Sequence, residues 1–172
     1  MSIRKLLALI SLSIIFAGSS VFAETTFEKI KRTGKVTVGT EAAFPPFEFV
    51  EDGKIVGYGK DILDYIVAEM KVELNQLDLP WQGILPGVLA GKFDFVATSV
   101  SIRAERAKKY AFTVPIAEGT NWVMKRSGDA SIKTPDDLSG KVVCTQLASG
   151  SEKATKEWQE DMKSRGLKGF KE

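Results

Sequence analysis

The strongest constraint on the fold is an alternation of strand-like and helix-like segments in the first part of the chain. Apolar residues recur at helical spacing over 62–70 and 84–89. Around these helices, β-branched and apolar residues typical of strands occupy 35–40, 72–79 and 93–98. Three strands joined by two helices predict right-handed crossovers and a parallel sheet, which places the chain in the α/β class.

Local signals refine these elements. Residues 47–50 and 54–56 flank a turn-forming Glu-Asp-Gly and predict a hairpin. Asp61 is the expected cap of the first helix. Pro86 is expected in the first turn of the second helix, which Gly91 ends.

A parallel sheet binds ligands at the carboxyl ends of its strands. Here that rule brings residues 40–47, Trp81 and residues 98–106 to one edge. The last of these segments presents two serines and two arginines directly after a buried strand, so a site is predicted there.

The C-terminal part shows a second, smaller pattern. Strands are predicted at 122–125 and 141–145, and Thr134-Pro135 predicts a capped short helix between them. Ser149 precedes a further helix that ends near Gly166. Two strands and two helices are too few to enclose a core in the manner of the first unit, so this part is expected to be incomplete.

The N-terminus has the pattern of an export signal. Arg4 and Lys5 precede the apolar run 6–17, and Val-Phe-Ala at 21–23 resembles a cleavage site. The alternative is a membrane anchor, but the run is shorter than the roughly 20 residues that a spanning helix needs. Because no cysteine follows the run, a lipid anchor is not expected.

Composition excludes several classes of function. Residues 1–23 hold two of the 24 basic residues and none of the 22 acidic ones, so the remainder has no net charge, and nucleic acid is not an expected partner. The absence of histidine excludes Ser-His-Asp catalysis and histidine metal ligation. Cys144, the single cysteine, cannot form an internal disulfide and is expected to be buried in a strand.

Three stretches resemble the periplasmic amino-acid-binding proteins of polar-amino-acid ABC transporters, extracellular solute-binding protein family 3. They are VGTEAAFPPFEFVEDGKIVGYGKDI, WQGILPGVLAGKFDFVATSVSIRAERAKKYAFTVP and DDLSGKVVCTQLASGSE, in the family's order. The resemblance implies a periplasmic-binding-protein-like fold with two parallel-sheet lobes. It assigns residues 1–23 to a signal peptide, 24–117 to lobe 1 and 118–172 to the start of lobe 2, which is incomplete in this C-terminally truncated chain.

The resemblance also implies ligand contacts. Arg106 matches the arginine that takes the ligand carboxylate, since a guanidinium offers two parallel donors. Ser101 matches the hydroxyl that accepts from the ligand ammonium, to which backbone carbonyls near Ser99 also contribute. Alternatively, both serines cap the following helix. Thr98 is a further candidate for the ligand side chain.

Other contacts are implied on either side of these residues. Phe44 and Trp81 match two rings that enclose the ligand side chain. Glu41 lies where an acid can meet a distal group, or is an exposed loop acid. Ser149 matches a hydroxyl at a helix N-terminus that can hold the carboxylate, or is a plain helix cap.

The implied function is a monomeric periplasmic binding component that captures a polar amino acid and delivers it to a membrane permease, without cofactor, metal or catalytic residue. One alternative is a periplasmic cyclohexadienyl-type dehydratase, for which Glu41 is the only nearby general acid. Another is the ligand-binding domain of a receptor. In the truncated chain, neither closure on ligand nor fully cooperative folding is expected.

Several residues depart from the family pattern and leave the identity of the amino acid open. Where the family usually has threonine, tyrosine and glycine, this chain has Arg103, Ile116 and Ala148. Where the family has an acid and an apolar residue, this chain has Gly59 and Lys60. Arg103 is expected to be solvent-exposed, as are Lys108 and Lys109.

Overall fold

The computed structural model describes residues 23–171, so the predicted signal peptide falls almost entirely outside the described residues. The first unit is built on a parallel sheet in the order β5-β1-β6. Strand β1 (Lys35–Thr40) pairs along its full length with β5 (Glu73–Asp78) and pairs at Val38 and Gly39 with the short β6 (Phe95–Val96). The α/β class and the parallel sheet are confirmed.

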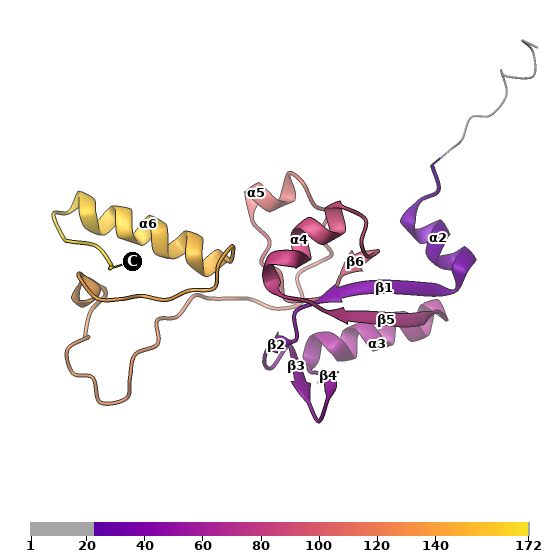
Figure 1. Cartoon of the computed structure of the whole chain (residues 1–172), viewed down its shortest axis with the longest axis horizontal. Coiled ribbons are helices and arrows are strands. Elements are labelled where there is room, and N and C mark those ends of the chain that lie inside the picture. Colours follow the sequence, from indigo (N-terminus) through magenta and orange to yellow (C-terminus); the bar gives the residue numbers. More distant parts are fainter. Residues whose placement is uncertain (1–22, 172) are drawn as a thin grey trace, which may run out of the picture.

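Helices cover both faces of this sheet (Figure 1). On one face, α2 (Thr26–Thr33) and α3 (Tyr58–Met70) bury a core with β1, formed by Ile30, Val36, Val38, Leu63 and Val67. On the other face lies α4 (Trp81–Leu89). There the buried Phe93 ring packs so closely on Gly39 and Gly87 that a Cβ on either glycine would lie within 2.7 Å of it.

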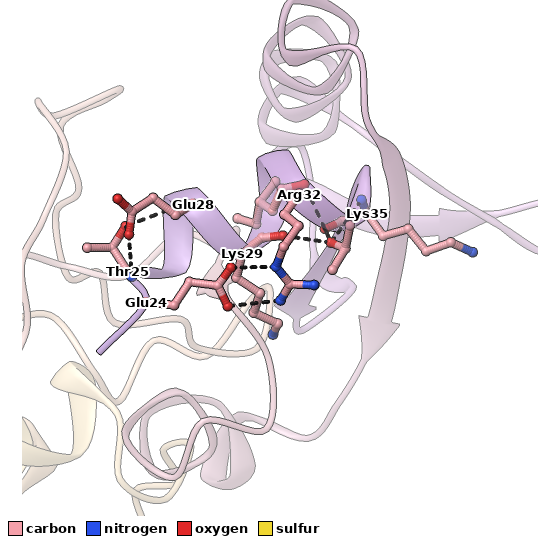
Figure 2. A network of polar contacts seen from close by, with 8 residues as sticks. Glu24, Thr25, Glu28, Lys29, Arg32 and Lys35 are labelled. Carbon is pink, nitrogen blue, oxygen red and sulfur yellow. Dashed lines mark hydrogen bonds and ion pairs between the residues drawn. The ribbon is translucent and has the colours of Figure 1, made fainter. Parts of the chain in front are cut away.

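Polar side chains stabilise α2 at its start and in its last turn (Figure 2). Thr25 and Glu28 form a capping box, which satisfies backbone N–H groups that the helix leaves open. The carboxylate of Glu24 accepts two hydrogen bonds from the Arg32 guanidinium, at 2.6 and 2.9 Å. The capping box and the contact between Glu24 and Arg32 thus stabilise α2, which contributes Ile30 to the core of the first unit.

An antiparallel sheet of β2 (Ala43–Phe44), β3 (Glu48–Glu51) and β4 (Lys54–Val56) confirms the predicted hairpin. Two helix details differ from expectation. The cap of α3 is Gly57 and not Asp61, which lies in the first turn. Because α4 already begins at Trp81, Pro86 lies inside the helix and not in its first turn.

The second unit has a separate core but no sheet among the described residues. The 3-10 helix η1 (Pro135–Leu138) and α6 (Gly150–Ser164) confirm the predicted helices, with Thr134 and Ser149 as their caps. The buried residues of this core are Leu138, Met162 and Phe170. A short helix, α5 (Ala104–Ala107), ends the first unit, and residues 110–134 then contain neither helix nor strand (Figure 1).

Three predictions for this part are therefore wrong. Residues 122–125 form no strand, and Trp122 and Met124 are 84% and 95% exposed. Residues 141–145 contribute only a single parallel bridge, between Val142 and Lys171. Cys144 is exposed and not buried. Each expectation assumed neighbouring strands, which the described residues do not supply.

No helix among residues 23–171 is long and apolar enough to span a membrane.

Candidate functional site

The carboxyl ends of β1, β5 and β6 bring three predicted segments together, as the edge rule requires. Past the end of β6, the Thr98 hydroxyl lies 3.4 Å from both the N–H and the carbonyl of Glu41. Past the end of β1, the N–H of Ala42 donates to the carboxylate of Asp78 at 2.9 Å. These contacts tie the three strand ends into one rim.

Arg106 and Trp81 form the centre of the candidate site. The guanidinium carbon of Arg106 lies 5.4 Å from the centre of the Trp81 ring, in cation–π geometry. Trp81 is 8% exposed, so it gives the arginine a rigid floor. One guanidinium nitrogen, Nη1, donates to the carbonyl of Ser101 at 3.1 Å. Because a guanidinium has five N–H donors, this arrangement orients it and leaves donors for an anion.

Burial lowers the pKa of Arg106 from its ordinary value, and the charge of Arg103 lowers it further. Glu105 and Tyr110 oppose this shift. An arginine remains charged through any such shift. Arg106 is half-buried, so its guanidinium lacks part of its hydration, and Arg103 places a second cation close by.

Ser99 donates hydrogen bonds to a buried carboxylate, that of Glu48, which was not among the residues predicted from the sequence. Glu48 is 2% exposed and accepts from the N–H of Ser99 at 3.2 Å and from its hydroxyl at 3.0–3.1 Å. A Cβ on Gly59 would overlap the Glu48 carboxylate, so Gly59 makes the space that it occupies. Burial raises the pKa of Glu48, and hydrogen bonds from Ser99 and Thr98 oppose the rise.

The capping alternative for the two serines is wrong. The N-cap of α5 is Arg103, and neither Ser99 nor Ser101 caps it. Ser99 instead uses its hydroxyl on Glu48, and Ser101 contributes its carbonyl to Arg106.

Phe44 and Trp81, the two rings expected to enclose the ligand side chain, contact different residues. The Phe44 ring is 53% exposed and stacks on Phe47, with 5.7 Å between ring centres and 14° between planes. Trp81 lies instead under Arg106. Phe44 thus presents a free face to solvent, while Trp81 is committed to the cation.

The second unit contacts the rim through Gln146, and Ser149 follows closely in sequence. The Gln146 side chain donates to the Glu41 carboxylate at 2.6 Å, across 105 residues of sequence. Ser149 caps α6 by accepting from the N–H of Glu152 at 3.1 Å, and its hydroxyl hydrogen remains a donor that a ligand carboxylate could accept. Glu41 is therefore partnered and half-buried, and is not a free loop acid.

A pocket of about 410 Å³ opens between α5 and the N-terminal part of α6, which face each other in Figure 1. Of the predicted contact residues, Arg106 and Ser149 line it. Arg103 lines it too, and it is half-buried, so the expectation of an exposed helix arginine is wrong. No group of acidic, histidine or cysteine residues suited to a metal ion occurs within residues 23–171.

Two functional candidates were missed at the sequence level, Glu48 and Gln146. A lone acid between two phenylalanines in the FEF stretch was the only available signal for Glu48. Nothing in the sequence marked Gln146, because its contact depends on how the two units meet.

Comparison with known proteins is consistent with this geometry. Residues 36–168 match the family model described as bacterial extracellular solute-binding proteins, family 3. The chain is 33% identical over 154 residues to the L-cystine-binding protein TcyJ of Escherichia coli (strain K12), covering 87% of this chain and 58% of that protein. It is 36% identical over 148 residues to the L-glutamate/L-aspartate-binding protein of Pseudomonas aeruginosa, covering 80% and 48%. The chain thus spans about half the length of these relatives.

Solved structures of amino-acid-binding proteins are also similar to this chain. The ancestral amino acid-binding protein AncCDT-1, described as a precursor of cyclohexadienyl dehydratase, matches with a TM-score of 0.70 and 33% identity, covering 78% of this chain and 61% of that one. The arginine-bound form of truncated ArgBP from T. maritima matches with a TM-score of 0.66 and 32% identity, covering 76% and 62%. A Phe57Trp mutant of arginine-bound domain 1 from TmArgBP matches with a TM-score of 0.50 and 40% identity, covering 52% and 70%.

Proposed function

We propose, from the premise that the chain belongs to the bacterial extracellular solute-binding proteins, family 3, that it is the amino-acid-binding component of an ABC transporter. The observation that carries this proposal is the Arg106 guanidinium, which lies over the buried Trp81 at the edge of a parallel sheet. A cation oriented in this way, with donors left over, suits the carboxylate of a free amino acid. Names of the relatives support an amino acid as the ligand class.

The proposed ligand contacts come from both units. They are Glu41, Phe44, Trp81, Thr98, Ser99, Ser101, Arg106 and Ser149. Residues 24–117 form lobe 1 in this proposal, and residues from 118 onward belong to lobe 2. A relative supports a leading role for lobe 1, since domain 1 of TmArgBP is described as arginine-bound.

In the full-length protein, closure on the ligand would use contacts that the rim already shows. The hydrogen bond between Gln146 and Glu41 connects the second unit to the first, and Ser149 lies with Arg106 along one pocket. A ligand that contacts both units favours the arrangement in which they meet.

We further propose export through residues 1–23, a periplasmic location, a monomeric state and delivery to a membrane permease. N-terminal sequencing of protein secreted by a bacterial host should give Glu24 as the first residue. Retention of residues 1–23 on the secreted protein would contradict cleavage at that position.

A melting-temperature screen of the purified full-length protein against the twenty common amino acids and L-cystine tests the binding function. A ligand that binds the folded state raises the melting temperature by mass action, and titration calorimetry should confirm the hit. If no amino acid raises the melting temperature or gives a binding isotherm, the proposal is wrong.

An enzyme on this scaffold has less support. The neighbour AncCDT-1 is described as a precursor of a dehydratase. Here, however, the carboxylate of Glu41, the general acid expected from the sequence, accepts a hydrogen bond from Gln146 at 2.6 Å. Turnover of a cyclohexadienyl acid by the purified protein would overturn the transport assignment.

A further inference from the structure

Arg103 places a second guanidinium beside Arg106. It is the N-cap residue of α5 but makes no side-chain capping bond. Its guanidinium packs on the first residue of α6, so closely that a Cβ on Gly150 would overlap Nη2. The Nε atom is buried and has no hydrogen-bond partner among the described residues.

Two guanidinium groups and a helix N-terminus border this pocket. Arg103 and Arg106 are three positions apart around the first turn of α5, so their side chains share one side of it. Both line the pocket whose far wall is the N-terminus of α6, with its open N–H groups. Placing two guanidinium groups and a helix N-terminus together is unfavourable unless an anion joins them.

Acidic residues on α6 compensate this charge only in part. Glu152 is paired with Lys156 and Glu157 with Lys153, each at 2.6 Å, so these acids are matched by lysines of the same helix. Glu105, on α5 itself, is exposed. Glu160 of α6 also lines the pocket. Among the described residues, however, neither Glu105 nor Glu160 lies within ion-pair distance of Arg103 or Arg106, so the two arginines face the pocket without a direct acidic partner.

We infer that Arg103 determines specificity, and that with Arg106 it selects a ligand carrying two carboxylates, such as an acidic amino acid. This inference rests on the proposed function and names its substrate class. One carboxylate binds Arg106 at the Trp81 floor. The second binds the Arg103 guanidinium at the α6 end of the pocket.

The test compares the purified full-length protein with its Arg103→Thr variant by titration calorimetry. The probes are L-glutamate, L-aspartate and L-cystine, with L-glutamine and L-arginine as neutral and basic counterparts. We expect a two-carboxylate ligand to bind most tightly, and Arg103→Thr to weaken it at least tenfold while changing L-glutamine binding less than twofold. The melting temperature of each variant without ligand shows whether the fold is retained.

Lys109→Thr is the matched control, because it removes a positive charge just beyond α5 from an exposed side chain that does not line the pocket. It should change no affinity more than twofold. Tightest binding of L-glutamine or L-arginine would overturn the inference and leave the proposed function intact. Equal weakening of all ligands by Arg103→Thr would also overturn it, and binding of no amino acid would refute both.

Discussion

The carboxylate of Glu48 accepts hydrogen bonds from both the backbone N–H and the hydroxyl of Ser99, 51 residues later in the sequence. This pair joins the antiparallel hairpin to the loop that follows β6. Since that loop carries Ser101, whose carbonyl orients Arg106, the hairpin indirectly positions the arginine.

Glu48→Gln should alter the dependence of stability on pH. Burial raises the pKa of Glu48 in the folded state, so the folded protein binds more protons than the unfolded chain above the ordinary value of 4.5. Stability from this group is therefore full below pH 4.5 and falls as pH rises through the raised pKa. Urea unfolding from pH 4 to pH 8 should show this fall in the wild type and a smaller one in Glu48→Gln.

The exposed Glu51 on the same strand provides the control, and Glu51→Gln should leave the profile unchanged. Glu48→Ala, which leaves the N–H of Ser99 without its partner, should cost about 1–3 kcal/mol of the free energy of unfolding. Identical profiles for the wild type and Glu48→Gln would contradict the raised pKa.

Arg106→Lys should weaken amino-acid binding about 10- to 100-fold while retaining the fold. Lysine keeps the charge but loses the planar fork that matches a carboxylate and stacks on Trp81. Calorimetry measures the affinity, and circular dichroism the fold. Arg126→Lys, at an exposed arginine of the segment between the units, is the control and should bind normally.

Ala148→Gly should stabilise the protein by about 0.5–1 kcal/mol. Ala148 has a φ of 60°, a left-handed conformation that costs a residue with a Cβ about 1 kcal/mol or more. Glycine adopts this conformation without strain. The gain is reduced because the glycine variant has more conformational entropy in its unfolded state. Ala154→Gly, inside α6, should instead destabilise by about 1 kcal/mol, and urea unfolding distinguishes the two signs.

Asp94→Asn should destabilise the protein at neutral pH by about 1 kcal/mol, allowing for the solvent exposure of its partner Lys29. Burial would raise the pKa of Asp94, but hydrogen bonds from Lys29 at 2.7 Å and from the N–H of Thr37 at 2.8 Å outweigh it and lower the pKa. The stability that this carboxylate contributes is present above the ordinary value near 3.8 and is lost as pH falls through the lowered pKa.

The difference between the wild type and Asp94→Asn should therefore narrow in acid unfolding experiments below about pH 4. Glu73→Gln removes the acid of an exposed pair with Lys35 and should cost no more than a few tenths of a kcal/mol. A difference that persists unchanged at pH 2.5 would contradict the ionic role of Asp94.

Much of the first unit could be predicted from local sequence. Strand β1 and the hairpin agree with their expected ranges because their signals, β-branched alternation and a Glu-Asp-Gly turn, lie within the segments themselves. Residues 122–125 and 141–145 show similar propensity but form no strands, because a strand also needs a hydrogen-bonding neighbour.

The candidate site could likewise be predicted only in part from the sequence. Edge geometry predicted that residues 40–47, Trp81 and residues 98–106 would meet, since strand direction alone determines it. The contact of Glu48 with Ser99, that of Gln146 with Glu41 and the position of Arg103 on Gly150 depend on packing between distant segments. No local pattern encodes such pairings.

The stacking of Arg106 on Trp81 has an optical consequence. A carboxylate that binds the guanidinium changes the electric field at the indole beneath it, so ligand binding should shift the ultraviolet emission of Trp81. The other two tryptophans lie elsewhere, Trp122 in solvent and Trp158 against Phe170. With both replaced by phenylalanine, the protein would report its own occupancy without an attached dye.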